Sequence, residues 1–257
     1  MGAGVRRGHV SILKSISASR LIRDCATVRT AMALFFAGVT LRPAPRPALR
    51  WYQPQCCATA MSDAEEARAI TLCEEWIEAH VIRLGLCPYA AKPFAAENIR
   101  YAVSPAADDE ELIDDFFLEG RILLDAPADE LATTMLVAPH YAGSIDEFSW
   151  LYNWLVDTLE DPDETLLSNG VQPAFFHPDW SFSELPAESP LHFEKRAPIP
   201  VVNLLRRADL NRVVQAGIEQ GVVVNKQIAE HNAAALEAEG VDAMAAVFAR
   251  LLQQHQS

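Results

Sequence analysis

Short strand-like segments alternate with amphipathic helix-like segments, and this alternation limits the folds open to the chain more than any single motif does. The expected strands are four short apolar or alternating runs: 99–103, 133–137, 171–176 and 201–205. Helical spacing of apolar residues occurs before and between the first three strands and after the fourth, where Ala-rich stretches occupy 225–239 and 241–254. The pattern predicts an α/β fold, with a single layered domain of about four mostly parallel strands and flanking helices.

Two sequence signals mark where helices begin. Ser62 is followed by Glu65, and Ser144 by Glu147, which is the capping-box spacing in which each side chain can bond the other residue's backbone N–H. Gly85 follows the first amphipathic stretch. We expect it to end that helix, because glycine tolerates the left-handed backbone found at many helix C-termini.

Charge divides the chain near residue 61. Residues 1–61 contain nine of the 21 Lys and Arg residues but only one of the 35 acidic residues, Asp24, so their formal charge is +8. Because the whole chain carries −14, residues 62–257 carry −22. An Arg-rich leader with almost no acids is typical of a transit peptide, so we expect 1–61 to be a disordered plastid or mitochondrial presequence and 62–257 to be the folded domain. There are two alternatives. Residues 1–61 could be a disordered basic tail, or translation could begin at Met61, which would give a cytoplasmic protein.

Composition argues against several functional classes. Residues 62–257 are too acidic to favour nucleic acid or an anionic membrane as a partner. The apolar run 31–39 is shorter than the roughly 20 residues that span a bilayer, so no membrane association is expected. Beyond residue 61 only Cys73 and Cys87 remain, too few for a disulfide framework or a four-cysteine zinc site. Familiar nucleotide-binding and hydrolase motifs are missing, so the sequence predicts no particular cofactor. It predicts no oligomeric state either.

Polar residues follow each expected strand. They are Ser104, His140, His177 with Asp179, and Arg206. In open α/β sheets, ligands bind at the carboxyl ends of parallel strands, so these groups should converge if the strands are parallel.

His177 and Asp179 are two residues apart, and in an extended chain both side chains leave the same face. This geometry suits a carboxylate that orients an imidazole, or a shared metal. The alternative is structural, with Asp179 capping a turn and His177 bonded to a backbone carbonyl. His140 is as well explained by a solvent-facing loop.

Cys87 stands between Gly85 and Pro88, and proline favours the first position of a helix. Cys87 would then be an N-cap with a lowered pKa, which suits a nucleophile. Alternatively, it follows the C-terminal end of the first helix, or is simply buried as a small apolar residue.

Two pairs of cations stand out in the acidic domain, Lys195-Arg196 and Arg206-Arg207. Guanidinium groups beside a strand end can bind a carboxylate or phosphate, so a small anionic molecule is an expected ligand. Neutralisation of neighbouring acids is the structural alternative. Residues 180–200 are irregular and rich in proline, which indicates a lid or a binding loop.

Three segments together resemble the domain of unknown function 1415 family of uncharacterised bacterial and organellar proteins, over roughly residues 69–239. They are 84–89 (LGLCPY), 176–180 (FHPDW) and 196–206 (RAPIPVVNLLR). The resemblance implies that Cys87, His177, Asp179, Arg196 and Arg206 belong to one site, but it implies no reaction. The chain departs from the family pattern at Ala197, where Ser is usual, and at Asn203, where His is usual.

Three functional hypotheses follow. The first is a hydrolase or transferase in which Cys87, His177 and Asp179 are catalytic and Ser104, Arg196 and Arg206 bind an anionic substrate. The second is a protein that binds Zn or Fe through His140, His177 and Asp179, with Cys87 as a further ligand. The third is a non-catalytic module that binds a ligand or partner through residues 180–200.

Overall fold

The structure is a computed structural model that describes residues 61–161, 165 and 167–254. All of them belong to one compact unit. The expected presequence, with Cys25, Cys56 and Cys57, lies outside the described residues except for Met61, and stays a prediction.

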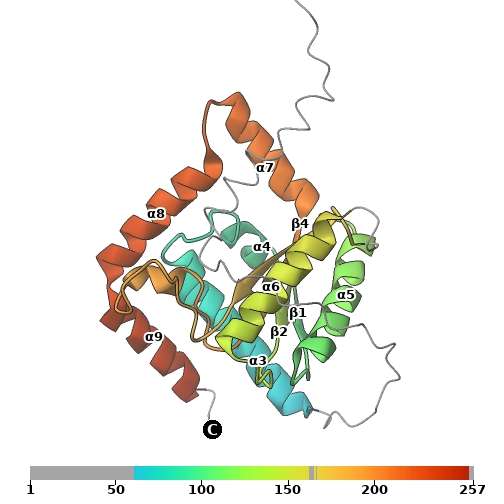
Figure 1. Cartoon of the computed structure of the whole chain (residues 1–257), viewed down its shortest axis with the longest axis horizontal. Coiled ribbons are helices and arrows are strands. Elements are labelled where there is room, and N and C mark those ends of the chain that lie inside the picture. Colours follow the sequence, from blue (N-terminus) through green and yellow to red (C-terminus); the bar gives the residue numbers. More distant parts are fainter. Residues whose placement is uncertain (1–60, 162–164, 166, 255–257) are drawn as a thin grey trace, which may run out of the picture. The chain divides into compact units, whose positions relative to one another are not determined.

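Four strands form one sheet in the spatial order β1-β2-β4-β3 (Figure 1). The strands are β1 (Ile99–Val103), β2 (Thr133–Val137), β3 (Val171–Phe176) and β4 (Val201–Arg206). β1 and β2 are parallel, whereas β4 is antiparallel to both of its neighbours, β2 and β3. The α/β class and the four strands are therefore confirmed, but the sheet is mixed because β4 runs against the other three strands.

The connection before β4 explains its direction. A parallel return would need a crossover, usually a helix, over one face of the sheet. Residues 177–200 contain only a short 3-10 helix, η3 (Pro190–Glu194), so the chain turns at the edge where β3 ends and comes back antiparallel. Periodicity within a strand carries no information about this choice.

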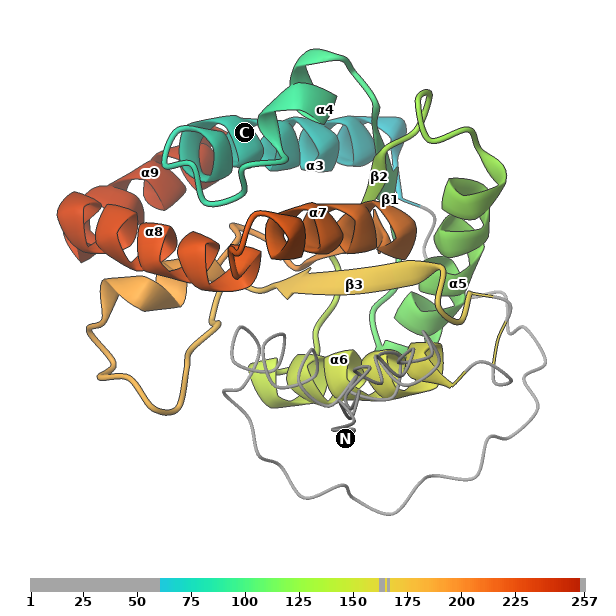
Figure 2. The same ribbon diagram turned by 90° about the horizontal axis from the view of Figure 1, so that it is seen from above.

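Helices cover both faces of the sheet. On one face lie α3 (Asp63–Trp76), its π-helical continuation η2 (Ile77–Ile82) and α9 (Val241–Gln254); on the other lie α5 (Asp109–Asp125) and α6 (Ile145–Glu160). Figure 2 shows α3 and α6 on opposite sides of β3. The remaining helices are α4 (Ala91–Ala95), α7 (Arg207–Glu219) and α8 (Val224–Glu239), and α8 packs against η3.

Consecutive phenylalanines of β3 show how each face is filled. Side chains alternate along a strand, so Phe176 packs edge-on against Trp76 of α3, with ring centroids 5.1 Å apart, while Phe175 lies 4.7 Å from Phe148 of α6. Phe148 is fully buried and also contacts Tyr141 and His177. It links the core to the loops at the carboxyl ends of β2 and β3.

Three local signals fix helix ends as expected, whereas the N-cap position expected for Cys87 is wrong, because α4 begins later, with Ala90 as its N-cap. Both capping boxes form: the Ser62 N–H donates to the Glu65 carboxylate at 2.9 Å, and the Ser144 N–H to the Glu147 carboxylate at 2.7 Å. Gly85 has φ +66°, and a Cβ atom there would lie 3.0 Å from the His231 ring. In the part of the chain that the structure describes, no helix combines the length and apolar character needed to cross a bilayer.

We predict that Phe148→Ala lowers the free energy of unfolding by about 3–5 kcal/mol, because it removes a fully buried ring and leaves a cavity. Urea titration followed by circular dichroism measures this change. Leu118→Ala on α5 is the matched control; its side chain is 57% exposed, so the loss should stay below about 0.5 kcal/mol. Equal losses in the two variants would contradict the assigned position of Phe148.

Candidate functional site

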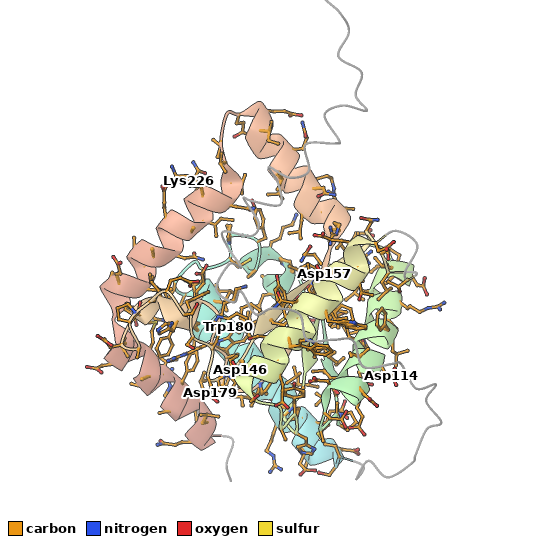
Figure 3. The ribbon with its side chains drawn as sticks, viewed as in Figure 1. Asp114, Asp146, Asp157, Asp179, Trp180 and Lys226 are labelled. Carbon is orange, nitrogen blue, oxygen red and sulfur yellow. The ribbon has the colours of Figure 1, made fainter. Side chains whose placement is uncertain are left out.

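Loops at the carboxyl edge of β3 bring five polar residues together. We call this group the strand-end site: Cys87, His177, Asp179, Lys195 and Arg196. The His177 N–H donates to the Lys195 carbonyl at 3.1 Å, which fixes the chain after β3 against the chain that leads into β4. Lys195 and Cys87 influence each other's ionisation, and Asp179 acts on both His177 and Arg196. Figure 3 labels Asp179 and Trp180 in this region.

The imidazole of His177 is held by backbone rather than by a carboxylate. The Asp179 N–H donates to His177 Nδ1 at 3.1 Å, while His177 is buried against Phe148, with ring centroids 5.2 Å apart. Burial lowers the pKa of His177, and the nearby Asp179 charge only partly opposes this shift. In the neutral ring, Nδ1 accepts and Nε2 carries the proton. His177 is therefore a neutral hydrogen-bond donor, whereas the expected general base would need a free ring nitrogen to accept a proton.

Cys87, on an exposed segment, lies near the buried amine of Lys195. Cys87 is exposed, and Lys195 is only 6% exposed with its Nζ 5.2 Å from the centre of the Phe176 ring. Burial lowers the pKa of Lys195 to about 8, although the Glu194 and Cys87 charges oppose this shift. Protein atoms around the sulfur raise the pKa of Cys87, and the backbone N–H groups of Tyr89 and Ala90 and the Lys195 charge work against that increase.

The Nε of Arg196 is held by a hydrogen bond, while its two terminal nitrogens are open. Its Nε donates to the Trp180 carbonyl at 2.8 Å, and its guanidinium carbon lies 4.9 Å from the centre of the Phe193 ring. Among the described residues, no side chain or carbonyl forms a hydrogen bond with its two terminal nitrogens. A guanidinium held in this way is oriented to bind a carboxylate or phosphate through two parallel hydrogen bonds.

In a comparison with protein-family models, residues 68–246 match the model "Protein of unknown function (DUF1415)". The chain belongs to this family. Comparisons with curated proteins and with solved structures returned no match. The family resemblance expected from the LGLCPY, FHPDW and RAPIP segments is thereby confirmed, and it brings no reaction with it.

Arg206 of this DUF1415 chain is at the wrong edge of the sheet to join the strand-end site. β4 runs antiparallel, so Arg206 lies opposite Val171, the first residue of β3. Its guanidinium donates to three backbone carbonyls: Leu131 at 3.0 Å, Ala126 at 2.7 Å, and Leu123. The expected convergence of Arg206 with His177 is therefore wrong. Arg206 instead ties the end of β4 to the C-terminal end of α5.

Ser104 is also committed to structure. Its buried hydroxyl donates to the Asp115 carboxylate of α5 at 2.5 Å and accepts from the Ala106 N–H at 3.1 Å. Both roles of the hydroxyl group are filled inside the protein, so its expected contact with a substrate finds no support in the structure.

His140 lies on a different face from His177, and the geometry does not offer the proposed Zn or Fe site. His140 is exposed and lines a shallow hollow of about 270 Å³ beside α3, with Glu65 and Ile199, whereas His177 packs on α6. Within the described ranges, no three His, Cys, Asp or Glu side chains gather closely enough to hold a metal ion.

Residues 180–194 form an anchored loop. The buried His192 accepts from the Phe182 N–H through Nδ1 at 3.1 Å, and its Nε2 donates to the Pro186 carbonyl at 2.8 Å. One ring thus joins the two sides of the loop. The burial of His192 and Lys195 could not be predicted from the sequence, where His192 has no distinctive neighbours and Lys195 is one of a pair of cations.

We predict that Arg206→Met lowers the free energy of unfolding by about 2–3 kcal/mol, because three backbone carbonyls lose a charged donor. Urea titration measures the loss. The control is Arg212→Met: Arg212 is 75% exposed and pairs with Asp209 on α7, so the change should stay below about 1 kcal/mol. An unchanged alkylation rate of Cys87 in Arg206→Met would agree with its distant position, and a large change in that rate would contradict it.

Proposed function

We propose that the protein is a hydrolase or transferase that acts on a small anionic substrate, with the strand-end site as its active centre. The observation that carries this proposal is that Cys87, an exposed residue, lies close enough to the buried amine of Lys195 for their charges to interact, directly before an arginine whose terminal nitrogens are open. Nucleophile, proton acceptor and anion-binding group are the parts that such a reaction needs.

Lys195 supplies the proton acceptor in this proposal. A pKa of about 8 leaves an appreciable fraction of Lys195 as the uncharged amine near neutral pH, since an ordinary lysine titrates near 10.5. The Cys87 thiol proton passes to this amine while the sulfur attacks the acyl carbon of the substrate and the leaving group departs. Water then cleaves the thioester in a hydrolase, or a second nucleophile accepts the acyl group in a transferase.

Arg196 and His177 supply the contacts to the anion. The guanidinium of Arg196 binds the substrate's carboxylate or phosphate, and the Nε2–H of the neutral His177 is available as a second donor. A neutral imidazole can donate a hydrogen bond without adding charge, as it does in enzymes that polarise a carbonyl.

One observation favours a second candidate, a non-catalytic module that binds a small anion. The pKa of Cys87 lies above its ordinary value, so its thiolate is scarce at neutral pH unless Lys195 takes up the proton. The two candidates share the anion site and differ only in the chemistry of Cys87.

We predict that Cys87 is alkylated by iodoacetamide at least about tenfold faster than Cys73, which is buried, when peptides of the full chain are quantified by mass spectrometry. Lys195→Met should move the midpoint of the rate against pH upward for Cys87, because the cation that favours the thiolate is gone. A midpoint that does not move would remove Lys195 from the proposed mechanism.

We predict that mono-(4-nitrophenyl) succinate is hydrolysed faster than the neutral 4-nitrophenyl acetate, and that Cys87→Ser abolishes this activity. Arg196→Met should raise KM for the anionic ester about tenfold or more and leave the neutral ester unchanged, because only the anion uses the guanidinium. If neither ester reacts, but succinate slows Cys87 alkylation in the wild type and not in Arg196→Met, the binding module is the correct candidate.

A further inference from the structure

The outward face of α6 carries two tryptophans between two aspartates. The buried face of this helix is formed by Phe148, Leu151, Tyr152, Leu155 and Leu159. At 100° per residue, the direction opposite to that stripe points through Asp146, Trp150, Asn153 and Asp157, with Trp154 beside them. We call Asp146, Trp150, Trp154 and Asp157 the α6 outer face.

Trp150 and Trp154 form an ordered aromatic surface there. They are one helical turn apart, and their rings are nearly parallel, at 17°, with centroids 6.5 Å apart. Both side chains are half-buried although they stand on the side of α6 away from the sheet. Among the described helices and strands, β3 and α5 make the most extensive contacts with α6, and β3 lies on its buried side (Figure 2). Tryptophan is costly to leave in water and is enriched at binding hot spots.

The charge around the two rings selects the occupant. Asp146 and Asp157 are exposed at the two ends of the tryptophan pair, and neither forms an ion pair with another described residue (Figure 3). A wholly apolar partner would desolvate these carboxylates without compensation. Residues 62–257 also carry −22, which attracts cations and repels nucleic acid and a second copy of this chain.

We propose that the α6 outer face binds a basic, arginine-containing segment of a partner protein in an extended conformation. The guanidinium groups stack on Trp150 and Trp154 while neighbouring basic side chains pair with Asp146 and Asp157. Alternate residues of an extended chain are roughly 6.6 Å apart, close to the 6.5 Å between the two ring centroids. Arginines at alternate positions therefore match the tryptophans. This surface is independent of the strand-end site.

The test is a titration of the full chain with the synthetic peptide (Arg-Gly)4, followed by tryptophan fluorescence and isothermal calorimetry. Binding of (Arg-Gly)4 should be saturable and severalfold tighter than that of (Lys-Gly)4, because guanidinium stacks on indole better than ammonium does. Trp150→Leu/Trp154→Leu keeps both positions apolar but removes both aromatic faces, and should weaken binding about tenfold or more. Asp146→Asn/Asp157→Asn should weaken it about fivefold.

The matched control removes the same charge elsewhere. Asp114 of α5 and Asp242 of α9 are exposed and lie on other helices, so Asp114→Asn/Asp242→Asn should leave binding within about twofold. Three outcomes would overturn the proposal: no saturable binding, equal weakening in the control and in Asp146→Asn/Asp157→Asn, or equal binding of (Glu-Gly)4. Circular dichroism of each variant shows whether it has folded, and the aspartate pair keeps the test decisive if the tryptophan variant does not fold.

Discussion

The position of β4 between β2 and β3, running against both, organises the rest of the described structure. Because β4 begins where β2 and β3 end, the chain before it is drawn to the carboxyl edge of the sheet, where Lys195 and Arg196 meet the residues that follow β3. Because β4 ends at the opposite edge, Arg206 becomes a bridge to α5. The direction of β4 thus places Lys195-Arg196 and Arg206-Arg207 at opposite edges of the sheet, although the two pairs look equivalent in the sequence.

Features that depend on neighbouring residues could be predicted. The capping boxes at Ser62 and Ser144, the left-handed Gly85 and the four strands all follow from local spacing and side-chain type. The direction of β4 could not be predicted, because it depends on how residues 177–200 cross the sheet and not on the apolar pattern of residues 201–206.

At the site, too, local spacing predicts which residues are close, but not the bonds that their side chains form. Proximity of His177 to Asp179 was readable from their spacing, but the backbone N–H of Asp179, rather than its carboxylate, meets the ring. Ser104 stands where ligands gather in many α/β sheets, yet the helix α5 folds back and offers Asp115 to its hydroxyl. Lys195 is buried because Phe176 and its neighbours surround it, and no local pattern in a run of charged residues indicates that burial.

The internal bonds of His192 bear on how selectively the strand-end site would accept the ligand of the proposed function. One ring nitrogen of His192 bonds Phe182 and the other bonds Pro186. Much of the conformational freedom of this loop is therefore lost when the protein folds and not when a ligand arrives. Trp180, whose carbonyl holds Arg196, begins this loop. Under the proposed function, this loop would favour molecules that fit without moving it, since moving it would also disrupt the two partly buried hydrogen bonds of His192.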